Sequence, residues 1–217
     1  MSLQKRFSQE DLNRIKDAVK QAEDKISGEI VPVFVERSGF YSIANYRGGI
    51  AAAFLAFAVI VILDRYIPSM AILDPLHIFL DVLLAGLVGT IITHYIDPVK
   101  RIMLSQSHMD QATRKRAENA FLEEEVFNTR HRTGIMIFVS FFEREVIVMA
   151  DRGISKVVEQ KEWDKLVQNI IEKIRMEKVA EGIEGSILRC GEILLDKGFL
   201  KTPDDINELR DDLRIEN

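Results

Sequence analysis

The stretch Gly48-Gly-Ile-Ala-Ala-Ala-Phe-Leu-Ala-Phe-Ala-Val-Ile-Val-Ile-Leu63 is the first of two long apolar runs in this sequence. The second run extends from Leu76 to Ile96. A helix that crosses the hydrocarbon core of a bilayer needs about 20 mainly apolar residues. The second run has that length, and the first reaches it when it continues to Ile67 with its two charged residues at the interface. The two runs predict a transmembrane helical hairpin over residues 48–96, with spans near 48–67 and 76–96; the alternative is a buried helix pair of a soluble protein.

The charges around the hairpin predict its orientation. Basic residues lie outside the two spans, whereas the loop between the spans holds two aspartates and one arginine. Because positive charge accumulates on the cytoplasmic side, we expect a multi-pass protein of the inner (plasma) membrane with both termini and the soluble domain in the cytoplasm. The single cysteine, Cys190, agrees with a reducing compartment. The basic residues that carry this expectation are Arg37, Arg47, Lys100, Arg101, Arg114, Lys115 and Arg116.

Composition excludes some classes of partner. The chain has 217 residues and a formal net charge of −5. A general nucleic-acid-binding protein carries a basic surplus, so we expect no nucleic-acid partner. A membrane-embedded hairpin implies contact with membrane lipid and with another membrane protein.

The polar flanks predict a small α/β fold. An apolar stripe from Leu12 to Ile26 predicts a helix capped by Ser8 and Asp11, and residues 29–35 predict a strand covered on both faces. A charged helix near 99–127, strands at 135–140 and 145–150, and helices at 161–178 and 179–197 follow. Residues 1–40 and 98–200 are therefore expected to be two parts of one domain, with an acidic tail over 201–217 and a short helix capped at Asp204.

Three segments together resemble the TPM-domain family: Ile26-Ser-Gly-Glu-Ile-Val31, Arg132-Thr-Gly-Ile-Met-Ile-Phe-Val139 and Glu143-Arg-Glu-Val-Ile-Val-Met-Ala-Asp-Arg-Gly-Ile154. The inserted apolar hairpin resembles a bacterial membrane branch of that family. The resemblance implies an α/β/α sandwich on a small mixed sheet. It also implies links to acid phosphatase activity, to calcium binding, and to the assembly or repair of membrane complexes.

The expected sheet collects charged residues at one edge. If the first two strands are parallel and the third returns as a hairpin, then Glu29, Arg132 and Asp151 share that edge, with Arg152 beginning the next helix. Asp151, Arg132 and Arg152 are the candidate catalytic residues, because arginines can hold a phosphate. Glu29 and Asp151 are the candidate metal ligands, because paired carboxylates suit calcium. The alternative is that Asp151 caps or pairs locally and that Glu29 pairs with an arginine.

Phe141 and Phe142 form the turn at the opposite edge, where the first strand leads toward the membrane. They could contact lipid or fill the core. Three functions follow from the sequence: a membrane-anchored TPM-like domain that acts by binding, as an assembly, repair or quality-control factor for membrane proteins; a phosphatase or other hydrolase; and a calcium-binding module.

Overall fold

The computed structural model describes residues 7–67, 74–176, 178–202 and 207–216, and the chain divides into two compact units. The first unit comprises Met1–Ser38 and Asp110–Asn217, and the second comprises Gly39–Met109. The second unit is thus an insertion in the sequence of the first. The sequence predicts a return to the first unit near residue 98, and the two compact units divide before Asp110.

A four-stranded mixed sheet with the order β3-β2-β1-β4 forms the centre of the first unit. Strand β1 (Glu29–Val35) pairs in parallel with β2 (Gly134–Ser140), with Glu29 opposite Gly134. Strand β3 (Glu145–Ala150) returns antiparallel to β2. Every residue of β1 and β2 is buried, as expected for strands that are covered on both faces.

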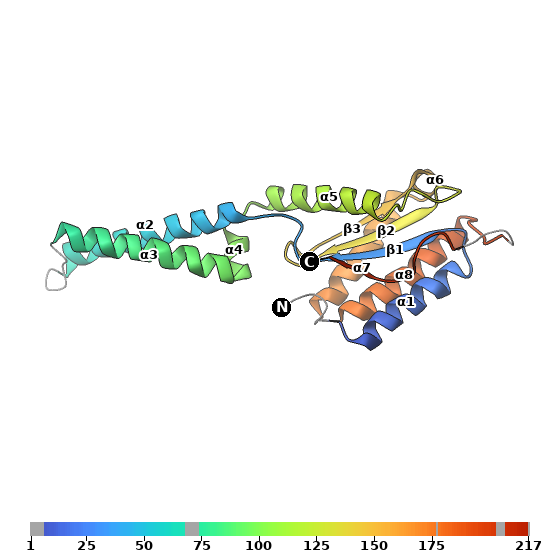
Figure 1. Ribbon diagram of the computed structural model, residues 1–217, viewed down its shortest axis with the longest axis horizontal. Helices are drawn as coiled ribbons and strands as arrows, with labels where there is room; N and C mark the ends of the chain where they lie inside the picture. The colour runs from blue at the N-terminus through green and yellow to red at the C-terminus, as the bar shows by residue number, and fades with distance from the viewer. Residues whose placement is uncertain (1–6, 68–73, 177, 203–206, 217) are drawn as a thin grey trace. The chain divides into compact units, whose positions relative to one another are not determined.

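Helices cover both faces of this sheet (Figure 1). Helices α1 (Gln9–Glu23), α7 (Gln160–Arg175) and α8 (Val179–Asp196) lie on one face over the larger hydrophobic core, and α5 (Gln106–Glu123) lies on the other. The short helix α6 (Arg152–Ser155) follows β3. This three-layer arrangement confirms the predicted α/β/α sandwich.

Local sequence signals explain how α1 begins. The Ser8 hydroxyl accepts a hydrogen bond from the Asp11 backbone amide, and the Asp11 carboxylate accepts one from the Ser8 amide. The predicted capping box is therefore present. The helix ends at Glu23, earlier than the apolar stripe suggested, because Ile26 leaves the helix to bridge Leu200.

The C-terminal tail supplies a strand that the sequence analysis did not predict. Strand β4 (Arg214–Glu216) pairs in parallel with Val33–Val35 of β1. Ion pairs hold the segment, because Asp212 contacts Lys16 at 2.7 Å and Arg214 contacts Glu124 at 3.0 Å. The expected short helix capped at Asp204 lies outside the described residues.

The second unit is built on two antiparallel helices, α2 (Ser42–Tyr66) and α3 (Pro75–Tyr95), followed by the short α4 (Asp97–Ile102). Small residues allow the two backbones to approach closely. A Cβ atom on Gly48 would lie 1.9 Å from Thr93 Oγ1, and one on Gly89 would lie 2.4 Å from the Ala52 Cβ. Large apolar side chains point away from this contact and are exposed, among them Phe54, Leu55, Phe79, Leu84, Leu87 and Ile91.

The predicted charged helix near 99–127 is divided in the structure. Helix α4 ends at Ile102, and α5 begins only at Gln106. The Met103 amide bonds to the Val99 and Lys100 carbonyls, which closes α4 as a separate helix. The Arg47 side chain donates to the Met103 carbonyl at 2.9 Å, so the break is tied to α2 within the second unit.

Candidate functional site

The amino ends of β1 and β2 and the carboxyl end of β3 meet at one edge of the sheet. Asp151 follows β3, and its backbone amide donates to the Gly134 carbonyl at the start of β2. One Asp151 carboxylate oxygen accepts the Arg152 amide and caps α6, while the other lies 2.8 Å from Arg132 Nε. One Asp151 carboxylate oxygen therefore accepts a hydrogen bond and the other forms an ion pair, and the side chain is 7% exposed.

The backbone around this ion pair is tightly built. Arg132 adopts a positive φ of 58°, and its carbonyl accepts the Gly153 amide at 3.0 Å. A Cβ atom on Gly153 would lie 2.5 Å from that same carbonyl oxygen. Only glycine fits such a close backbone approach without displacement. Arg152 lies beside this turn with an exposed side chain.

Glu29 shares this edge but faces another partner. Its backbone amide donates to the Thr133 carbonyl, which continues the β1–β2 ladder. Its carboxylate accepts hydrogen bonds from the backbone amides of Glu208 (3.0 Å) and Leu209 (3.4 Å) in the C-terminal tail. Thus the structure joins Arg132 with Asp151, whereas the contacts of Glu29 are with the tail.

Glu23, which the sequence analysis did not select, lies close to Glu29. Both side chains line a cavity of about 160 Å³, together with Lys20, Asp24, Ile26, Gly28, Lys201 and Asn207. Glu23 is 8% exposed, and its Oε1 accepts the Ile30 backbone amide at 2.8 Å. A signal existed in the sequence, because Glu23 is four residues after Val19 and three before Ile26, on the apolar side of the helix.

The surroundings of these two carboxylates favour their neutral forms. Burial raises the pKa of Glu23 to about 8, and the neighbouring charge of Glu29 adds to the shift. Burial also raises the pKa of Glu29, although the amides of Glu208 and Leu209 oppose the shift. The Glu23 carboxyl group can therefore take up or release a proton near pH 8.

Metal coordination, cysteine reactivity and small-ligand binding in this cavity have less support among the described residues. No group of three or more histidine, cysteine, aspartate or glutamate side chains within them is arranged to hold a metal ion. Cys190 is fully buried, and burial raises the pKa of its thiol to about 12, so it is not a reactive nucleophile. The 160 Å³ cavity is smaller than most ligand pockets, which measure roughly 300–1,000 Å³.

The opposite edge of the sheet shows where the two turn phenylalanines lie. Phe142 is 6% exposed, and the Arg37 guanidinium lies 4.5 Å from its ring centroid. Phe141 packs edge-on against Phe34 at 5.7 Å and contacts Phe7 at 6.2 Å. Both rings therefore contribute to packing within the first unit.

The fold and these edges define the first unit as an α/β/α domain with an inserted pair of apolar helices. The family model of the TPM domain matches residues 100–193, which include α5, β2, β3, α6, α7 and most of α8. The chain carries a TPM domain, as the sequence resemblance predicted.

A solved structure agrees with this assignment at the level of the fold. The NMR structure of the BA42 protein from the psychrophilic bacterium Bizionia argentinensis sp. nov. is similar, with a TM-score of 0.58 and 18% sequence identity. The similarity covers 97% of this chain and 95% of that chain. No curated protein matches this chain.

Proposed function

We propose that this protein is a membrane-anchored TPM domain that acts by binding, as an assembly, repair or quality-control factor for other membrane proteins. The observation that carries the proposal is the exposure of α2 and α3. Both helices are long and apolar enough to cross a membrane, and only 11% of the most apolar window of each is buried within the protein. A core helix of a soluble protein would be mostly buried instead.

Aromatic residues at the helix ends support the same proposal. Tyr46 lies near the start of α2, and Tyr66 and Tyr95 end α2 and α3. The three side chains are 65%, 78% and 78% exposed. Tyrosines at these positions are typical of the interface between a bilayer and water.

The geometry of the Asp151 edge also favours binding over catalysis. Asp151 is engaged by the Arg152 amide and by Arg132, so neither oxygen is poised toward a substrate. The inserted position of α2 and α3 gives the TPM domain two covalent links to the helices, at residues 36–41 and at 96–109. In this proposal the hairpin lies in the inner membrane and both termini are cytoplasmic.

Two measurements test the proposal. First, membrane fractionation should recover the full-length protein in the membrane fraction, and alkaline carbonate should not release it. Second, a photo-crosslinking residue at Leu84, which is 60% exposed on α3, should give one defined protein adduct in intact membranes. The same probe at the buried Ile187 of α8 should give none. Recovery in the soluble fraction, or lipid adducts alone at Leu84, would contradict the proposal.

Calcium binding is a second candidate function, because Glu23, Glu29 and the Asn207 side chain line one cavity. Calcium prefers oxygen ligands and requires ionised carboxylates. Affinity should therefore increase as the pH rises through 8. Calorimetry with calcium on the full chain should show heat that Glu29→Gln removes and Asp151→Asn retains; equal heat in all three proteins would argue against this site.

A further inference from the structure

A groove of about 530 Å³ lies beside α7, at the end of the sheet opposite Asp151. We call it the α7 groove. Two arginines, Arg144 and Arg175, border it, and five apolar residues line it: Val139, Phe141, Val146, Ile171 and Ile174. Its volume is typical of a site for a small ligand.

The charge of the α7 groove is positive. Arg144 and Arg175 are both exposed, and among the described residues neither has a hydrogen-bond or ion-pair partner. Glu145 also borders the groove, but its carboxylate bonds to Thr113 of α5, on the other face of the sheet. Alternate residues of a strand face opposite sides, so the Val146 side chain faces the groove and the Glu145 side chain does not.

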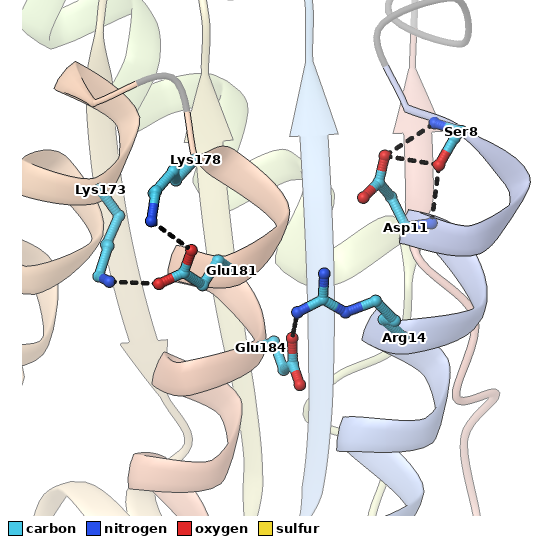
Figure 2. A network of polar contacts seen from close by, with 7 residues as sticks. All are labelled: Ser8, Asp11, Arg14, Lys173, Lys178, Glu181 and Glu184. Carbon is cyan, nitrogen blue, oxygen red and sulfur yellow. Dashed lines mark hydrogen bonds and ion pairs between the residues drawn. The ribbon is translucent and has the colours of Figure 1, made fainter.

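Two acidic side chains of α8, Glu181 and Glu184, already have basic partners. Figure 2 shows that Glu181 bonds to both Lys173 and Lys178, at 2.5 and 3.2 Å. Glu184 is likewise paired with Arg14 across α1 and α8, at 2.5 Å (Figure 2). Within the part of the chain that the structure describes, Arg175, the last residue of α7, forms no ion pair with these acids.

The backbone at Arg144 gives a second, independent observation. Arg144 ends the β2–β3 turn with a φ of 59°, a conformation that a residue with a Cβ seldom adopts. Glycine would adopt it with less strain. An arginine kept in such a conformation points to a use for its side chain.

We propose that the α7 groove binds the phosphate and part of one acyl chain of an anionic membrane phospholipid. Guanidinium groups hold phosphate oxygens through paired, charge-assisted hydrogen bonds, and the apolar lining of the groove provides a surface for the acyl chain. The strand that leaves this end of the sheet, β1, continues through residues 36–41 into α2. This proposal rests on the proposed membrane anchoring for its source of lipid.

Native mass spectrometry of the full chain in a neutral detergent tests the α7 groove. After lipid removal, phosphatidylglycerol should bind at least roughly tenfold more tightly than phosphatidylcholine, because only the first leaves its phosphate charge unbalanced. Arg144→Gln with Arg175→Gln should abolish this preference. The matched control is Lys156→Gln with Lys161→Gln. It removes two exposed positive charges, one just before α7 and one in its first turn, and should retain the preference for phosphatidylglycerol. Fluorescence of the buried Trp163 checks that each variant is folded.

Three results would overturn the proposal. The groove variant could bind phosphatidylglycerol as tightly as the wild type, or the control variant could lose the preference equally. Glycerol 3-phosphate could also compete as well as the lipid, which would make the groove a site for free phosphate. Because these measurements are made in detergent, they do not depend on whether a protein partner exists.

Discussion

The carboxylate of Glu23 accepts a 2.8 Å hydrogen bond from the backbone amide of Ile30, the second residue of β1. Strand β4 pairs with β1 only from Val33 onward, so it does not reach this amide. The Glu23 side chain therefore takes the place of a strand at the beginning of this sheet edge. A buried amide without such a partner would be destabilising.

We predict that Glu23 makes the first unit less stable as the pH rises. Burial raises the pKa of Glu23 from 4.5 to about 8 in the folded protein. A group whose folded pKa is raised stabilises the fold fully below its unfolded pKa, and this stabilisation is lost as the pH rises through 8. Glu23→Gln should remove a decline on the order of 4 kcal/mol between pH 4.5 and 8.

Thermal unfolding followed by Trp163 fluorescence measures this effect in the first unit, since the chain has one tryptophan. Glu10→Gln, an exposed change on the same helix, is the control and should keep the wild-type profile. If wild type and Glu23→Gln showed parallel pH profiles, the carboxylate would not be the titrating group.

We predict that Asp151→Asn weakens the fold and leaves any phosphomonoester turnover unchanged. Asparagine can still cap α6, but it carries no charge to balance Arg132. The expected loss is about 1–2 kcal/mol, because Arg132 is partly exposed. Arg152→Gln should be neutral. Turnover of p-nitrophenyl phosphate that disappears in Asp151→Asn with the fold intact would instead support a hydrolase.

The strands and the two apolar helices could be predicted because their sequence signals are local. Residues 29–35, 135–140 and 145–150 are short apolar runs with polar ends, and 48–63 and 76–96 are too apolar for an ordinary surface helix. The position of Arg132 and Asp151 at one edge of the sheet followed from one parallel pair of strands and one β-hairpin. Each of these inferences needs only neighbouring residues and one rule of connectivity.

The features that were missed depend on distant contacts. Residues 214–216 contain a single apolar residue, and they form β4 only because β1 offers an open edge and Glu124 pairs with Arg214. The partner of Glu29 lies 179 residues away in the tail. Glu23 was overlooked because its burial depends on the sheet that α1 covers. No local pattern contains that information.

We predict opposite effects of alanine at two glycines of the first unit. In Gly153→Ala, the new methyl group would meet the Arg132 and His131 carbonyl oxygens at 2.5 and 2.6 Å, so the turn must move. The expected destabilisation is about 1–3 kcal/mol. Gly185→Ala lies within α8 with no atom within 4 Å and should stabilise by about 0.5–1 kcal/mol. Chemical denaturation followed by Trp163 fluorescence compares them; equal effects would contradict the close approach at Gly153.

We predict that Gly89→Ala separates α2 from α3, whereas Gly86→Ala does not. A methyl group on Gly89 would lie 2.8 Å from the Gly48 carbonyl oxygen, but one on Gly86 would lie at an ordinary 3.5 Å from its nearest atoms. The contact between Asn45 and His94, at 3.3 Å, offers a place to measure the separation. Cysteines at these two positions, joined by a short bifunctional thiol reagent, should crosslink efficiently in Gly86→Ala and poorly in Gly89→Ala. The native Cys190 is fully buried with a pKa raised to about 12, so it should not react. Equal crosslinking in both variants would show that small residues do not determine the distance between these helices.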